Sequence, residues 1–145
     1  MVLFAAAHVH LFLINQIFIN GVTHRLNCMV EVVTIGYGGK KPDAFFAELE
    51  ALGADLVVDV RANPFHAFLG VYTKRGLEER LGGTYVWVKE LGNSTRELPP
   101  TLVDETVGLA KLRALMVGCR RIALLCAEKD ETQCHRSYIK AKITA

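Results

Sequence analysis

Short apolar runs alternate with amphipathic segments from residue 30 to the end of the chain. Continuous aliphatic or β-branched runs predict four strands, at residues 30–35, 55–60, 84–88 and 121–126. Apolar residues at helical spacing predict four helices, over residues 42–52, 74–81, 101–116 and 135–143. Glycine, proline and polar residues separate these segments, as expected of turns and loops.

The alternation of strand and helix predicts a single α/β domain. Its crossovers are long enough for a mainly parallel four-stranded sheet with helices on both faces. Residues 122–125 are apolar without interruption, which is typical of a strand covered on both faces. Ligands of such sheets bind beyond the carboxyl ends of the strands. The loops of interest therefore follow Ile35, Val60, Val88 and Cys126.

The first 28 residues differ from the rest of the chain. They are mainly apolar and carry one charged side chain, Arg25, whereas all 15 acidic residues follow Cys28. Polar residues interrupt this leader, so it is a poor membrane span, and it lacks the basic start of a secretory signal. Two interpretations stay open. The leader is an added helix with a wide apolar face, or it is not translated because the biological start is Met29. The α/β domain accordingly occupies residues 29–145.

Composition narrows the class of protein further. The chain has 145 residues, of which 51% are hydrophobic and 22% charged, which indicates one globular domain and excludes a disordered chain. A net charge of +2 is too small to indicate sequence-independent nucleic-acid binding. Four cysteines are too few for a disulfide scaffold. We expect a cytoplasmic protein that is not embedded in a membrane.

The loop after the first predicted strand is rich in glycine. It reads Gly36-Tyr37-Gly38-Gly39-Lys40-Lys41 and leads into a helix. Glycines allow backbone N–H groups to face a ligand, and a helix N-terminus favours an anion. We therefore predict that Gly36, Tyr37 and Gly38 contact a ligand. A tight turn between strand and helix is the alternative, because the spacing matches neither the dinucleotide nor the phosphate-loop motif.

The second predicted strand ends in Asp59-Val60-Arg61. Side chains alternate along a strand, so Asp59 and Arg61 point to the same side. A carboxylate at the end of an apolar strand needs a partner, so we expect Asp59 to be buried and paired with Arg61 or Arg136. An arginine at this edge is also well placed to bind an anion. Asp59, Arg61 and Arg136 are therefore predicted ligand-binding residues.

The loop after the last strand carries the most chemistry. Cys126 ends the strand, and Cys134, His135 and Arg136 begin the final helix. A helix N-terminus with Arg or His nearby lowers the pKa of a thiol, so we predict a catalytic Cys126 or Cys134, with Glu128 or His135 moving protons. A metal site, a Cys126–Cys134 disulfide and buried, inert thiols are alternatives. No metal site is predicted, because Cys-x7-Cys-His is not a standard zinc spacing.

Several of these segments together resemble one known family. They are Thr34–Tyr37, Val58–Arg61 with Pro64, Leu91-Gly92, Leu125–Glu128 and Cys134–Arg136. From about residue 30 to its end, the chain resembles the uncharacterised family called domain of unknown function 488. The resemblance implies a single α/β domain with these motifs at one end of the sheet, and no particular reaction. The chain departs from the family at Tyr37-Gly38, where His-Ser is common, so the resemblance supplies no general base there.

A fainter likeness connects the chain to rhodanese-type sulfurtransferases. They also have Asp-Val-Arg at one strand end and a cysteine at a later strand end. Their catalytic loop is short and closes with Arg-Ser, whereas here nine residues separate Cys126 from Arg136-Ser137. The same cradle around a thiolate would therefore need a different loop fold. The acidic side chains in this loop would also repel an anion.

Two functional hypotheses follow. The first is a domain that binds a small anionic or phosphorylated ligand, with thiol-dependent catalysis as its extension. The second is a non-catalytic module that binds nucleic acid or a protein partner. It would use basic residues and loop aromatics: Lys40, Lys41, Lys74, Arg75, Arg80, Arg120, Arg121, Phe65, Phe68 and Tyr72. The motifs identify neither a cofactor nor an oligomeric state.

Overall fold

The computed structural model describes residues 16–19, 22–25 and 29–145. In the leader, strands β1 (Gln16–Ile19) and β2 (Val22–Arg25) pair antiparallel. These eight residues are extended. The rest of the leader lies outside the described residues, so its interpretation as an added helix or as an untranslated segment stays a prediction.

The α/β domain is built on one parallel sheet, which confirms the predicted fold class. Its strands are β3 (Glu31–Gly36), β4 (Leu56–Asp59), β5 (Tyr85–Trp87) and β6 (Arg121–Cys126). Their order is β3-β6-β4-β5, so β6 lies between the strands that carry the glycine loop and the Asp59 motif. Parallel pairing brings the carboxyl ends of all four strands to one edge.

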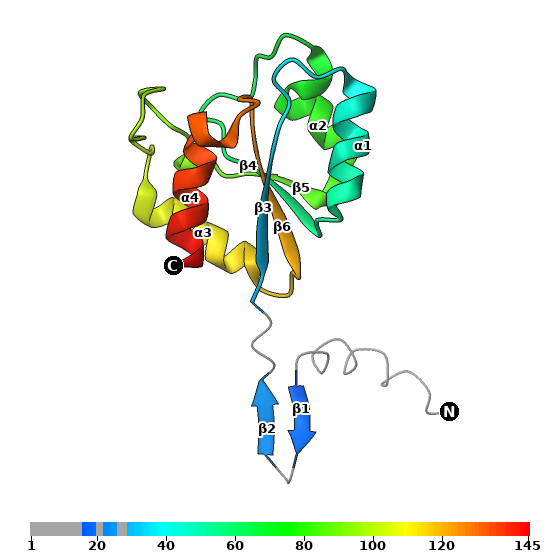
Figure 1. The fold of residues 1–145 in the computed structure, drawn as a ribbon, viewed down its shortest axis with the longest axis vertical. Coiled ribbons are helices and arrows are strands. Elements are labelled where there is room, and N and C mark those ends of the chain that lie inside the picture. The colour runs from blue at the N-terminus through cyan, green and yellow to red at the C-terminus, as the bar shows by residue number, and fades with distance from the viewer. Residues whose placement is uncertain (1–15, 20–21, 26–28) are drawn as a thin grey trace, which may run out of the picture.

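Helices cover both faces of this sheet, as predicted (Figure 1). α1 (Pro42–Leu52) and α2 (Lys74–Leu81) lie on one side, and α3 (Glu105–Met116) and α4 (His135–Thr144) on the other. Four 3₁₀ turns occupy Gly70–Tyr72, Gly82–Thr84, Lys89–Leu91 and Glu131–Gln133. Among the described residues, no helix combines the length and apolar character needed to cross a membrane.

Two apolar cores hold the three layers together. Phe45 of α1 and Leu77 of α2 are buried against one face of the sheet. Leu112 of α3 and Ile139 of α4 are buried against the other. Because β6 is covered on both sides, its apolar run shows no alternation, and the strand end at Cys126 is held firmly.

One predicted boundary is wrong. The apolar spacing predicted a helix from residue 101, but α3 begins at Glu105. Asp104 caps the helix, with its side chain accepting a hydrogen bond of 3.0 Å from the Val107 amide. Leu102 instead forms an isolated antiparallel bridge with Asn93, outside the helix. The cap decides the start of the helix, although the apolar spacing continues upstream.

The glycine loop after β3 lies directly against the loop after β6. The Tyr37 amide donates to the Cys126 carbonyl, and the Gly38 amide donates to the Ala127 carbonyl at 2.8 Å. A Cβ on Gly36 would lie 1.8 Å from the Glu128 carbonyl oxygen. Glycine is therefore needed here because another backbone approaches, and these amides already have protein partners.

Gly36→Ala is expected to lower the free energy of unfolding by about 1–3 kcal/mol, because the added methyl group overlaps the Glu128 carbonyl. Gly70→Ala is the matched control, since a Cβ there would meet nothing within 4 Å. The control is expected to stay within about 0.5 kcal/mol of the wild type. Urea denaturation measures both changes, and equal stabilities of the two variants would contradict the close backbone contact.

Candidate functional site

A buried ion pair occupies the end of β4. Asp59 is fully buried, and Arg61 donates to it through Nε at 2.9 Å and Nη2 at 2.6 Å. The expected pairing of Asp59 with an arginine is confirmed, and the partner is Arg61. Burial opposes the charge of Arg61, but the hydrogen bonds and charge of Asp59 outweigh it and raise the pKa of the guanidinium. Tyr85 also donates its hydroxyl to Asp59, which keeps the carboxylate satisfied.

The remaining donors of Arg61 serve the protein as well. Its Nη1 donates to the Tyr37 hydroxyl at 3.0 Å and to the Tyr72 carbonyl at 2.7 Å. Tyr37 and Tyr72 stack with their ring centroids 4.5 Å apart. Arg61 thus joins the glycine loop, the end of β4 and the segment before α2. An anion that binds Arg61, as predicted, would therefore have to compete with Asp59, Tyr37 and the Tyr72 carbonyl for the donors of its guanidinium.

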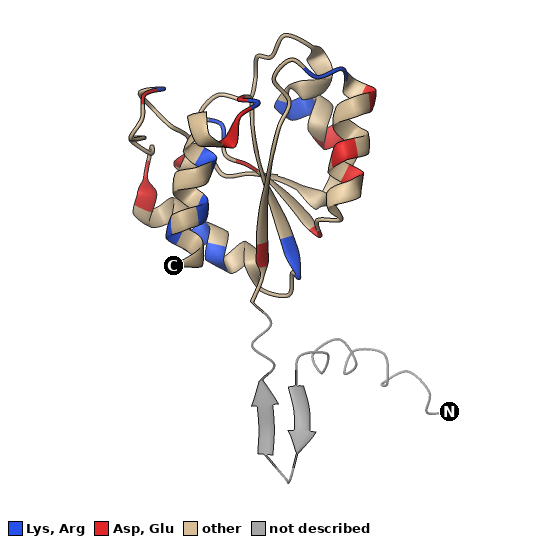
Figure 2. Ribbon diagram, in the orientation of Figure 1, with Lys and Arg blue, Asp and Glu red and all other residues tan. Residues whose placement is uncertain are grey.

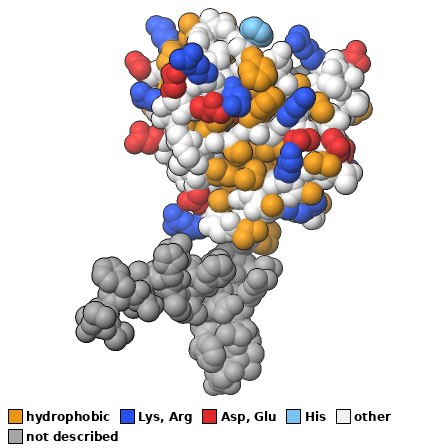
Figure 3. Space-filling view, turned by 180° about the vertical axis from the view of Figure 1, so that it is seen from behind, with side chains coloured by type: hydrophobic (Ala, Val, Ile, Leu, Met, Phe, Trp, Pro, Cys, Tyr) orange, Lys and Arg blue, Asp and Glu red, His pale blue; other side chains and the backbone are white. Residues whose placement is uncertain are grey.

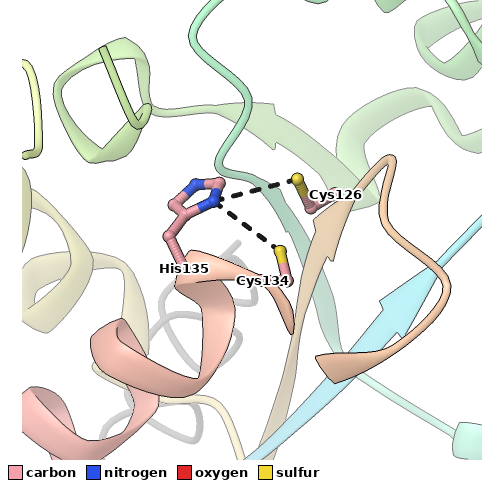
Figure 4. Close-up of side chains that lie close together, drawn as sticks. All are labelled: Cys126, Cys134 and His135. Carbon is pink, nitrogen blue, oxygen red and sulfur yellow. Dashed lines mark hydrogen bonds between the residues drawn. The ribbon is translucent and has the colours of Figure 1, made fainter. Parts of the chain in front are cut away.

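Two thiols and one imidazole converge at the carboxyl edge of the sheet (Figure 4). His135 Nδ1 lies 3.6 Å from Cys134 Sγ and 4.0 Å from Cys126 Sγ. His135 Nε2 lies 2.7 Å from the Val60 carbonyl oxygen. A carbonyl only accepts hydrogen bonds, so Nε2 carries a proton and Nδ1 is directed at the two sulfurs. The predicted Cys126, Cys134 and His135 are thus brought together.

Arg136 follows His135 in α4 and is buried, with 1% of its surface exposed. It donates from Nη2 to the Glu128 carbonyl at 2.7 Å, and its Nε has no hydrogen-bond partner. Within residues 29–145, no carboxylate forms an ion pair with it. A buried cation needs a compensating charge, and the charge of Arg136 acts on the Cys134 thiol.

The surroundings of the two sulfurs shift the pKa values of the two thiols in opposite directions. A hydrogen bond from Cys126 lowers the pKa of the Cys134 thiol. Burial opposes this effect, while His135 and both the amide and the charge of Arg136 add to it. The hydrogen bond to Cys134, together with burial, raises the pKa of Cys126. Of the two thiols, Cys134 at the start of α4 is therefore the one that loses its proton more readily.

A cavity of about 350 Å³ opens beside these groups. Six of the ten predicted site residues line it: Tyr37, Arg61, Cys126, Glu128, Cys134 and His135. The other four, Gly36, Gly38, Asp59 and Arg136, lie outside its wall and support the loops that form it. The structure therefore separates the predicted set into residues that face the cavity and residues that hold it.

Sequence reasoning missed several residues of the cavity wall. Asn63 and His66 follow β4, Asn93 and Arg96 follow β5, and Gln133 precedes α4. Arg96 has a φ of 61°, a left-handed conformation that is uncommon outside glycine. The rule that ligands bind at strand ends did indicate these loops. It could not select these residues, because Asn, His and Arg are ordinary in any solvated loop.

Asp59→Ala is expected to lower the free energy of unfolding by about 3–5 kcal/mol, because it leaves the buried Arg61 charge without a partner. Glu48→Ala is the matched control, since it removes a carboxylate from an exposed pair with Lys40. That change is expected to cost at most about 1 kcal/mol. Denaturant titration compares them, and a loss for Asp59→Ala no greater than that for the control would show that the pair does not stabilise the fold.

Comparisons with known proteins place the chain in a family. Searches of curated proteins and of solved structures found no match. The family model described as Domain of unknown function DUF488 matches residues 41–105 and 100–143. These ranges include the end of β4, the cavity loops that follow β4 and β5, and the Cys126–Arg136 segment. The chain therefore belongs to the DUF488 family.

Proposed function

We propose that this protein is a thiol-dependent enzyme that acts on a small anionic substrate at the carboxyl ends of its strands. Cys134 is the nucleophile and His135 is its proton partner. The observation that carries the proposal is the placement of His135, with Nδ1 3.6 Å from Cys134 Sγ and Nε2 held by the Val60 carbonyl. A nucleophile beside a base that a third group orients is the arrangement that covalent catalysis needs.

The proposed reaction is a hydrolytic group transfer in two steps. The Cys134 thiolate bonds to an electrophilic atom of the substrate, and the leaving group departs with the electron pair of the broken bond. The protonated His135 gives its Nδ1 proton to that leaving group. Neutral Nδ1 then takes a proton from a water molecule, whose oxygen displaces the sulfur and regenerates the thiolate. Cys126 lies close to Cys134 and lowers its pKa, which favours the attacking thiolate.

The wall of the cavity supports an anionic substrate, although not through the arginines that the sequence indicated. Arg96 lines the cavity, and no carboxylate among the described residues forms an ion pair with it. Its planar guanidinium suits a carboxylate, phosphate or sulfate group. Asn63 and Asn93 add amide groups to the same wall. Glu128 is the carboxylate in this wall, and we assign it to proton transfer with water or substrate.

The distribution of charge gives less support to the alternative of a nucleic-acid-binding module. Five of the seven basic residues considered for that role pair with acidic side chains: Lys40, Lys74, Arg75, Arg120 and Arg121. Basic and acidic residues are mixed over the elements in Figure 2 and over the face seen in Figure 3. Binding to phosphate backbones depends on a coherent basic surface. We therefore favour the enzyme.

Brief alkylation with iodoacetamide tests the proposed nucleophile. Cys134 is expected to react at pH 6–7 faster than Cys119, because its surroundings lower the pKa of Cys134, while burial raises that of Cys119. The groups facing Cys134 are Cys126, His135 and Arg136. Raising the pH should increase labelling of Cys119 by about tenfold per unit and change labelling of Cys134 little, since only the thiolate reacts.

Two variants make this experiment decisive. His135→Asn is expected to slow labelling of Cys134 at pH 6, because the imidazole that stabilises the thiolate is gone. Cys119→Ser is the control and should leave the Cys134 rate unchanged. Mass spectrometry of the peptides identifies the labelled residue. Labelling of Cys119 or Cys126 before Cys134 would refute the assignment of the nucleophile.

Inorganic phosphate tests the anionic substrate class. Phosphate in the cavity is expected to protect Cys134 from iodoacetamide, and Arg96→Ala should weaken that protection. A charge-assisted hydrogen bond contributes about 1.5–3 kcal/mol, which corresponds to roughly a 10–150-fold loss of affinity. Arg113→Ala removes an exposed arginine of α3 that does not line the cavity, so it should leave protection unchanged. Equal protection in both variants would remove Arg96 from the binding site.

A further inference from the structure

We propose that Cys126, Cys134 and His135 also form a binding site for a soft divalent cation, with Zn²⁺ as the reference ion, and that the bound ion reversibly blocks the thiol. The binding part depends only on the geometry of these residues. The blocking part rests on the proposed function, because it concerns the reactivity of Cys134.

The geometry approaches that of tetrahedral coordination. The two sulfurs and one imidazole nitrogen all lie within 4.8 Å of one another. Zn–S bonds of about 2.3 Å and Zn–N bonds of about 2.0–2.1 Å separate neighbouring tetrahedral ligands by roughly 3.6–3.8 Å. The observed distances from His135 Nδ1 are 3.6 Å to Cys134 Sγ and 4.0 Å to Cys126 Sγ. Small side-chain movements would therefore complete three sides of a tetrahedron.

The tautomer of His135 suits a metal ligand. Its Nε2–H donates to the Val60 carbonyl at 2.7 Å, so Nδ1 faces the sulfurs and, when it carries no proton, can direct its lone pair at an ion between them. A ligating histidine characteristically donates its other ring N–H to a carbonyl or carboxylate, which orients the ring and increases its basicity. This outer-shell hydrogen bond comes from the end of β4, next to the buried Asp59–Arg61 pair. The imidazole is thus held in the orientation that coordination would require.

The surroundings leave a fourth position accessible. All three side chains line the cavity, where a water molecule or an anion can complete the coordination shell. Three protein ligands with one open position are the pattern of exchangeable or catalytic zinc, whereas structural sites have four protein ligands. The chain spacing argued against a metal site. The loop between β6 and α4 nevertheless folds back through the turn at Glu131–Gln133 and returns Cys134 to Cys126.

Coordination accounts for every proton and charge at the site. Each ligand binds without a proton: Cys134 binds as a thiolate, and the Cys126 thiol proton and any proton on His135 Nδ1 are released to solvent when the ion binds. No electrons are transferred. Both lone pairs that could attack a substrate or accept its proton, on Cys134 Sγ and His135 Nδ1, then belong to metal bonds. An enzyme that uses this thiol would be inactive until the ion is removed.

Zinc binding is tested first on the reduced full-length protein, without any activity assay. Competition with a chromophoric chelator is expected to show one tight Zn²⁺ site per chain. Co²⁺ in its place should give thiolate-to-metal charge-transfer absorption. Cys126→Ser, Cys134→Ser and His135→Ala should each weaken zinc binding by more than about 100-fold, because loss of a ligand exceeds the effect of an outer-shell change. Cys119→Ser is the matched control and should bind zinc like the wild type.

A second measurement does not depend on whether the variants fold. Wild-type protein saturated with Zn²⁺ should lose at least about tenfold in the rate of Cys134 alkylation, and a chelator should restore that rate. Protein alkylated beforehand at both cysteines should no longer bind Zn²⁺. Zinc affinity that is equal in wild type and all variants, or alkylation that is unaffected by saturating zinc, would overturn the inference.

The outcomes separate this inference from the proposed function. Rapid alkylation of Cys134 without tight zinc binding would overturn the metal site and leave the nucleophile standing. Tight zinc binding with slow alkylation of the metal-free protein would support the metal site and refute the nucleophile. The two proposals are therefore tested by different readouts of one set of variants.

Discussion

The buried pair of Asp59 and Arg61 is the interaction on which the site depends. It places a carboxylate and a guanidinium at the end of a central strand, where neither contacts water freely. Arg61 then reaches Tyr37 and the Tyr72 carbonyl, so one side chain connects three segments that are distant in sequence. Between the paired residues, the Val60 carbonyl accepts a hydrogen bond from His135. The conformation of this strand end therefore determines how the imidazole is oriented.

A second constraint is the charge of Arg136. Burial of a guanidinium without a carboxylate partner is costly, because desolvation is not repaid by an ion pair. Backbone carbonyls offer only partial compensation, and the Nε of Arg136 has no hydrogen-bond partner. The charge of Arg136 lowers the pKa of the Cys134 thiol at the start of α4 and also that of Asp130. The fold and the proposed chemistry are therefore compatible, since the proposed nucleophile would, as a thiolate, lie near this buried cation.

Much of this architecture could be predicted from local patterns. The uninterrupted apolar run of β6 predicted a strand buried on both faces, and the alternation of elements predicted a parallel sheet. The polarity of Asp59 at the end of an apolar strand required a cationic partner. The start of α3 was wrong by four residues because a capping aspartate competes with apolar spacing, and spacing alone does not show which prevails. Local sequence patterns predicted an element correctly where one effect dominated, as burial does in β6, and failed where two effects of similar size compete, as at the start of α3.

The sequence by itself determined the class of fold and the residue types at the carboxyl edge of the sheet, where the candidate site residues lie. Only the tertiary structure decided which of those residues face the cavity. Of the two arginines predicted to bind an anion, Arg61 lines the cavity but already donates to protein groups, and Arg136 lies outside its wall. Arg96, which was not predicted, lines the cavity. The chain spacing of the two cysteines suggested no metal site, but their distance in space is short. These outcomes depend on the order of strands and on how a loop folds back, which arise from packing between segments far apart in the chain. Composition and periodicity depend only on the local preference of each segment. They therefore could not predict which side chains line the cavity or that the two cysteines lie close together.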